Sequence, residues 1–137
     1  MDLDRAPVDE WLIALFGAET SAVWELGGAS ADADGSPCGA LYTVPAVGWR
    51  SSGCARVASV RFGWQASAIG VDRRAVQALA DSVRAVLCRV RWPHEMGDQA
   101  LTLWEPTSTV GAGRRSGDPR ALWVASESFE IEVTGRH

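Results

Sequence analysis

The amino-acid sequence predicts an α+β fold, in which a single-layer, mostly antiparallel sheet has two helices packed on one face. Three observations predict it. Apolar and polar residues alternate through Arg56–Ser67, which is the spacing of a strand with one buried side. Apolar residues recur with helical spacing directly after Gly70. A second alternating stretch, Arg120–Val133, closes the chain, so strands both precede and follow the helix and favour a sheet covered on one side.

The first segments predict a helix, a brief strand and a loop. Asp2–Gly17 is the expected helix, because Pro7 suits a first turn and Gly17 suits an end. Ser21–Leu26 is a strand candidate that two glycines stop. Residues 28–39 are small, acidic and rich in turn formers, which predicts a flexible surface loop.

The next apolar segment, Ala40–Trp49, predicts a strand that contains Pro45. Proline has no N–H to donate to a neighbouring strand, so we expect an edge strand or an interrupted one. Arg50–Gly53 then turns the chain into the central strand. The short connection predicts that the two strands form a hairpin.

The central strand and the helix after it, within Ala55–Arg91, form the best-patterned region. The apolar face of the strand holds Ala58, Val60, Phe62, Trp64 and Ala66, and the helix stripe holds Val76, Leu79, Ala80, Val83, Val86, Leu87 and Val90. We expect Val60, Phe62 and Trp64 to pack against the middle of that stripe. The expected partners there are Leu79, Val83 and Leu87. Arg61 and Gln65 fall on the other face of the strand, where we expect them to contact solvent or a neighbouring subunit.

The chain after this helix predicts a break, two strands and a second loop. Trp92–Gly97 is the break and Leu101–Glu105 a short strand. Residues 107–119 are rich in Ser, Thr and Gly, which predicts a flexible loop that presents Arg114 and Arg115. Arg120–Val133 is the closing strand.

Composition predicts one soluble domain spanning residues 1–137. The chain is 47% hydrophobic and 22% charged, values that are ordinary for a globular protein. A net charge of −4 argues against non-specific nucleic-acid binding. The three cysteines form no CxxC pair, which suits a reducing compartment. No segment has the length and apolar character of a membrane span, so we expect a cytoplasmic protein with no membrane partner.

Catalytic motifs are sparse in the sequence. His94 is the main candidate base, and it has only Cys38, Cys54 or Cys88 as possible nucleophiles, with no local motif to support a pair. The glycines of residues 111–117 resemble a phosphate loop superficially, but a P-loop requires Lys and the chain has none. The carboxylates are dispersed and lack metal-ligand spacing. We therefore expect no enzyme activity, no cofactor and no metal.

The order of these elements resembles the tail terminator, or tail-completion, proteins of long-tailed bacteriophages, a family that includes the minor tail protein U of phage lambda. Three places carry the resemblance. The central strand at residues 57–66 runs into a helix with frequent Ala and Arg at residues 75–87. The sequence Gly-Asp-Pro-Arg at residues 117–120 leads into a long closing strand. A short helix precedes an early strand.

The resemblance implies a structural protein that forms a hexameric ring. Such a ring caps the tail tube and joins it to the head-side connector, while DNA passes through the lumen without specific binding. The implied location is the tail–neck region of the virion, after assembly in the host cytoplasm. The candidate subunit or partner contacts are Arg61, Gln65, Arg114, Arg115 and Arg120.

Two alternatives stay open at this point. Another ring protein of the neck or tail, such as a head-closure or tube protein, shares the same kind of small α+β or β-rich design. A small cytoplasmic enzyme or ligand-binding domain would instead use His94 and a cysteine. Oligomer size and the effect of replacing His94 distinguish these classes.

Overall fold

The computed structural model describes residues 3–28, 36–51, 58–114 and 122–135, and the side chains of residues 46–51 and 58 are not described. The helices of this described part are α1 (Ala6–Thr20) and α2 (Arg73–Arg89). Its strands are β1 (Trp24–Leu26), β2 (Cys38–Ser51), β3 (Ala58–Gly70), β4 (His94–Met96), β5 (Gln99–Arg114) and β6 (Trp123–Gly135). The predicted order of elements is therefore correct in outline, with β4 as an addition.

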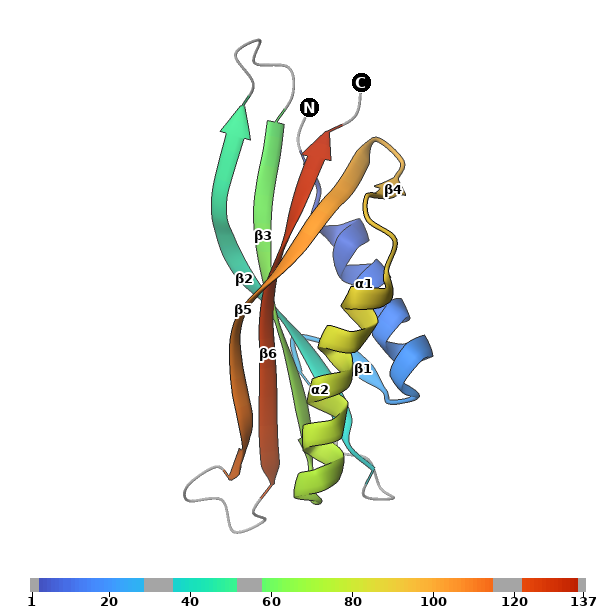
Figure 1. The fold of residues 1–137 in the computed structure, drawn as a ribbon, viewed down its shortest axis with the longest axis vertical. Coiled ribbons are helices and arrows are strands. Elements are labelled where there is room, and N and C mark those ends of the chain that lie inside the picture. The colour runs from blue at the N-terminus through green and yellow to red at the C-terminus, as the bar shows by residue number, and fades with distance from the viewer. Residues whose placement is uncertain (1–2, 29–35, 52–57, 115–121, 136–137) are drawn as a thin grey trace.

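The strands form a single curled sheet in the order β1-β2-β3-β6-β5-β4. Every neighbouring pair is antiparallel except β1 with β2, which is parallel. Both helices lie on the same face of this sheet, as Figure 1 shows. The predicted fold class, α+β with a mostly antiparallel sheet and two helices on one face, is confirmed.

Two long hairpins extend to opposite ends of the molecule (Figure 1). The pair β2–β3 is the predicted hairpin, and its register shifts between Val44 and Gly48, around Pro45. The strand is thus interrupted where a residue without an N–H was expected to interrupt it. The second hairpin, β5–β6, runs to the pairing of Arg114 with Trp123.

The core lies between the helices and the sheet. The buried residues of α2 are Val76, Leu79, Ala80, Val83, Val86 and Leu87, which is the predicted stripe without Val90. Trp64 is fully buried in the same core and stacks on Phe129 of β6, with ring centroids 5.9 Å apart. Phe62 packs at the margin of this core, whereas Val60 is half-buried and lies outside the cluster, so the packing prediction fails for Val60.

The first helix is longer at its end than the sequence predicts. It begins at Ala6, later than the predicted start at Asp2, and has Pro7 in its first turn as expected. It then continues through Gly17 to Thr20. The Thr20 hydroxyl donates to the carbonyl of Phe16 and accepts from Trp24 Nε1 at 2.9 Å, and these bonds hold the last turn. The helix ends where Ser21 adopts a left-handed φ of 60°. The predicted end at Gly17 is wrong because tertiary contacts support one more turn.

The predicted loop at residues 107–119 is wrong for residues 107–114, which belong to β5. They pair with β6 despite their Ser, Thr and Gly content, because a long partner strand determines pairing more strongly than local propensity does. Register shifts after Leu101, Pro106 and Val110 absorb the residues that fit poorly. Residues 115–119 lie outside the described part of the chain, as do residues 29–35 of the other predicted loop, which ends before Cys38. The predicted break at residues 92–97 contains β4.

Candidate interaction surface

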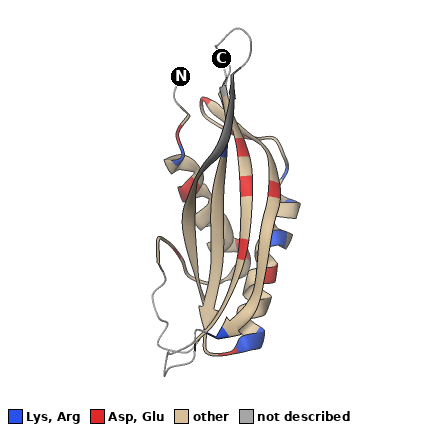
Figure 2. Ribbon diagram, turned by 90° about the vertical axis from the view of Figure 1, so that its left-hand side faces the viewer, with Lys and Arg blue, Asp and Glu red and all other residues tan. Residues whose placement is uncertain are grey.

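Two of the predicted contact residues, Arg61 and Gln65, lie on the sheet face that points away from the helices, here called the outer face. They alternate along β3 with Phe62, Trp64 and Ala66, which face the helices. Figure 2 looks towards this uncovered side of the sheet. The prediction that Arg61 and Gln65 share the face opposite the core is confirmed.

Arg61 is part of an ion-pair group that crosses three strands. Its Nη1 lies 3.1 Å from the Glu105 carboxylate of β5 and 3.5 Å from the Glu130 carboxylate of β6. Glu105 and Glu130 are direct cross-strand partners, and Arg61 is the partner of Glu132. Two carboxylates therefore share one guanidinium, and Glu132 lies opposite Arg61 in the strand pairing. We call these four residues the acidic patch.

Gln65 belongs to a polar strip at the centre of the outer face. Its Nε2 donates to Ser67 Oγ at 3.1 Å and to Ser126 Oγ at 3.4 Å, and the two hydroxyls are 2.8 Å apart. Ser67 is almost completely buried although no helix covers this side. These side chains therefore satisfy one another at the centre of the outer face.

Arg114 occupies a different place from Arg61 and Gln65. It ends β5, and its guanidinium lies 4.9 Å from the centre of the Trp123 ring, whereas that of Arg73 from α2 lies 5.9 Å from the same ring. Arg61 pairs with Glu132 and Arg114 with Trp123, so the two arginines are about 30 Å apart along β6 at about 3.3 Å per residue. Arg115 and Arg120 lie outside the described residues.

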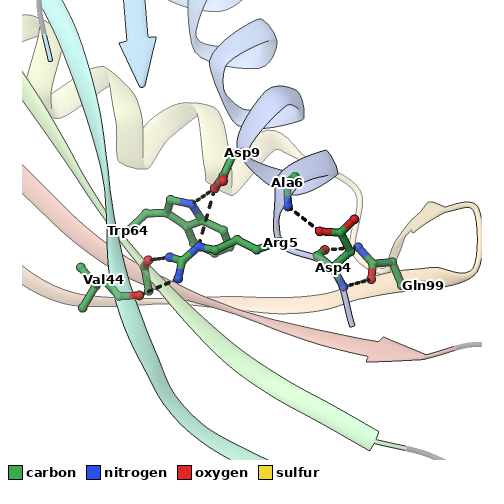
Figure 3. A network of polar contacts seen from close by, with 8 residues as sticks. Asp4, Arg5, Ala6, Asp9, Val44, Trp64 and Gln99 are labelled. Carbon is green, nitrogen blue, oxygen red and sulfur yellow. Dashed lines mark hydrogen bonds and ion pairs between the residues drawn. The ribbon is translucent and has the colours of Figure 1, made fainter. Parts of the chain in front are cut away.

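A partly buried polar network that the sequence did not reveal fixes the N-terminal segment to the sheet (Figure 3). The Arg5 guanidinium donates to the carbonyl of Val44 at 2.7 Å and to that of Gly63, beside the register shift of β2. Trp64 Nε1 donates to Asp9 Oδ1 at 2.7 Å. Burial lowers the pKa of Arg5 from its ordinary value, and the nearby Asp9 carboxylate partly offsets that shift. The one sequence signal is the spacing of Arg5 and Asp9, four residues apart around Pro7.

Gln99 makes a second connection between the N-terminal segment and the sheet (Figure 3). Its amide accepts from Asp4 N at 3.1 Å and donates to Asp4 O at 2.7 Å. The Asp4 carboxylate accepts from Ala6 N at 3.0 Å, at the start of α1. The helix entry is therefore held to β5 as well as to β2 and β3.

The Cys–His alternative does not fit the positions of His94 and Cys38. His94 lies on β4 and stacks on Trp11, with ring centroids 4.6 Å apart. Cys38 is buried on β2, and β3, β6 and β5 separate β2 from β4 in the sheet. Cys88 is exposed on α2, and Cys54 lies outside the described residues. Within the described ranges, no three His, Cys, Asp or Glu residues gather as metal ligands.

Two strand edges of the sheet are largely uncovered in the described part of the chain. The strand β1 pairs with β2 only over Gly39–Leu41, so β2 continues to Ser51 without a described neighbour on that side. The strand β4 pairs with β5 only over Gln99–Leu101, so β5 continues likewise to Arg114. Both edges present backbone N–H and C=O groups that a further strand could pair with.

A shallow hollow of about 320 Å³ lies between the helices. Its lining is Leu15, Glu19, Val86, Arg89 and Val90, and Arg89 lies 3.6 Å from Glu19 across it. A few apolar side chains and one exposed ion pair make a poor ligand site, since specific pockets combine enclosure with convergent polar groups.

In the part of the chain that the structure describes, these features define an α+β protein with a sheet face that neither helix covers and two largely bare strand edges. Comparison with protein-family models and with curated protein sequences finds no match for this chain. Neither helix of the described part is long and apolar enough to cross a membrane.

Proposed function

We propose that this chain is a structural assembly protein of a long-tailed bacteriophage, a tail terminator that forms a ring, caps the tail tube and meets the head-side connector. The observation that carries the proposal is the pair of bare strand edges at opposite sides of one sheet. The resemblance in the order of elements to tail terminator proteins is the reason for proposing a bacteriophage tail as the assembly.

The two edges differ from each other, which favours a ring. One edge is the outer half of β2 and the other is most of β5. A contact between two unlike surfaces repeats from copy to copy and produces a closed ring when the rotation closes. A twofold dimer would instead need one surface that complements itself.

Both edges also carry features that limit indiscriminate strand pairing. Pro45 lies in the bare part of β2 and Pro106 in the bare part of β5, each beside a register shift. Prolines and bulges interrupt the row of donors and protect an edge from aggregation. The edges thus suit a selective partner better than an open-ended fibre.

The charge of the chain suits a ring through which DNA passes. The net charge is −4. A ring of net negative charge does not attract phosphates and would not retard a moving duplex. The proposed partners are further copies of this chain, the tail tube protein and the connector protein, and the proposed location is the tail–neck region of the virion.

The experiment that tests the proposal measures the mass of the purified protein by light scattering, alone and with isolated tail tubes. A ring of defined mass that binds tube ends, seen also in class-averaged electron micrographs, supports it. A protein that is monomeric at every concentration and does not bind tail tubes contradicts it. A ring that binds the connector or stacks into tubes would favour the second candidate, a head-closure or tube protein.

The enzyme alternative has its own test. His94 stacks on Trp11 and is its remaining candidate base. If His94→Ala leaves folding, assembly and tube binding unchanged, the structural role stands without it. An activity abolished by this substitution would instead favour the enzyme reading.

A further inference from the structure

A cluster of positive charge marks the end of the molecule where α2 begins and β5 ends. Arg73 and Arg74 are exposed in the first turn of α2, and Arg114 is exposed at the end of β5. The guanidinium groups of Arg73 and Arg114 lie 5.9 Å and 4.9 Å from the ring centre of Trp123, the first residue of β6. We call these four residues the basic end. In Figure 2, blue segments lie at the lower end of the molecule and red segments lie further along the strands.

Helix stability does not explain the basic end. Positive charge near a helix N-terminus opposes the helix dipole, and the first turn of α2 carries no acidic residue. Asp72 caps the helix by accepting from the backbone N–H of Arg74 at 3.2 Å. Among the ion pairs that the described residues form, none includes Arg73, Arg74 or Arg114.

The stability of the sheet does not explain the acidic patch either. Glu105 and Glu130 face each other directly across β5 and β6, an arrangement of like charges that destabilises a strand pair. Arg61 relieves part of this repulsion, but one guanidinium serves both carboxylates. The side chain of Glu105 is 55% exposed, so the patch can be reached from outside.

The two surfaces cannot satisfy each other within one chain. Glu130 lies seven positions after Trp123 on β6, roughly 20 Å along the strand, which exceeds the reach of an arginine side chain. Each surface is therefore available to another molecule of opposite charge. The chain itself supplies both charges, and Arg with Trp is the composition that dominates well-packed protein interfaces.

We propose that the basic end of one copy docks on the acidic patch of a second copy, in a head-to-tail contact. This inference rests on the proposed ring and adds a charged contact to the strand edges that join its subunits. Duplex DNA is the competing occupant of the basic end, but the net charge of −4 opposes it. A second copy meets no such opposition, because its acidic patch matches the basic end in charge.

The test neutralises one surface at a time and then mixes the products. Arg73→Gln with Arg74→Gln weakens the basic end, and Glu105→Gln with Glu132→Gln weakens the acidic patch while Glu130 stays paired with Arg61. The matched control for the basic-end variant is Arg89→Gln with Arg91→Gln, which removes two positive charges at and just after the exposed C-terminal end of α2. Sedimentation velocity at low and high salt measures self-association for each protein.

We expect the wild type and the control to self-associate. Each neutralised variant should self-associate more weakly, with a dissociation constant at least about tenfold above that of the wild type. High salt should weaken the wild-type assembly. The decisive sample is an equimolar mixture of the two variants. One retains an intact acidic patch and the other an intact basic end, so the mixture should form a dimer joined by the single remaining contact.

Several outcomes would overturn the inference. The wild type could stay monomeric, the variants could assemble like the wild type, or the mixture could stay monomeric. The inference is also wrong if the protein does not self-associate but binds duplex DNA through Arg73 and Arg74. If the variants still form rings that bind tail tubes, only the assigned surfaces are wrong. If the head-to-tail contact forms but tubes are never bound, only the tail-terminator proposal fails.

Discussion

Replacing Arg5 tests whether the buried network holds the interrupted part of β2 in place. We choose Arg5→Met, because methionine keeps a long apolar side chain over the rings of Phe62 and Trp64 while it removes the guanidinium. The carbonyls of Val44 and Gly63 then lose their charged donor. The backbone around the register shift becomes the least supported part of the β2–β3 hairpin.

The expected cost follows from the contacts that are lost. A hydrogen bond to a charged group contributes about 1.5–3 kcal/mol. The bond to Val44 is exposed to solvent, so it contributes well under about 1 kcal/mol to the free energy of unfolding. The bond to Gly63 is part-buried and contributes a larger share of the range of about 1.5–3 kcal/mol, because solvent screening matters less there. Loss of the cation–π contact adds about 0.5–1 kcal/mol. Removing the desolvation cost of the buried charge offsets part of the loss, so we expect about 2–3 kcal/mol.

Urea denaturation followed by tryptophan fluorescence measures this free energy of unfolding. Arg5→Lys is the matched variant, because it keeps a charge but cannot donate in a fork to two carbonyls, and it should recover only part of the loss. An Arg5→Met protein whose free energy of unfolding lies within about 0.5 kcal/mol of the wild-type value would refute the reasoning. Equal stability of Arg5→Met and Arg5→Lys would show that charge is irrelevant there.

Three further substitutions test other parts of the structure. Leu79→Ala should lower the free energy of unfolding by about 2–5 kcal/mol because the side chain is buried in the core, and a loss below about 1 kcal/mol would mean that the α2 stripe does not bear on the sheet. Gly39→Ala should destabilise by about 1–3 kcal/mol, because a Cβ there would collide with the ring of Trp24; a neutral effect in thermal unfolding would show that β1 shifts freely. Gln77→Ala should cost about 0.5–1.5 kcal/mol and speed hydrogen exchange at Ala112, whose N–H donates to the Gln77 side chain at 2.8 Å; unchanged exchange would mean that this bond does not hold β5.

The fold was more predictable than the candidate surface. Alternation in β3 and β6 and the stripe of α2 are local patterns, and the sheet and helix they predict were confirmed. The pairing of β5 was not predictable, because Thr107–Arg114 has a loop-like composition and becomes a strand only beside β6. The extra turn of α1 depends in the same way on Thr20 and Trp24, which meet only after folding.

The predicted contact residues separate into two groups in space. Sequence periodicity placed Arg61 and Gln65 on the outer face, and this was correct. It could not show that Arg61 is shared by Glu105 and Glu130, because those residues come from strands far along the chain. Nor could it bring Arg73 to the same ring as Arg114, since that neighbourhood exists only where α2, β5 and β6 converge.

The sequence by itself determined which residues face the core and which class of fold they build, because burial patterns repeat with the period of each element. Only the tertiary structure decided where charge and bare strand edges gather, because these depend on partners distant in the chain. Arg5 illustrates the difference. In the sequence it is one arginine before a proline, whereas in the fold it bridges two strands through Val44 and Gly63 and leaves β2 positioned with its outer edge open.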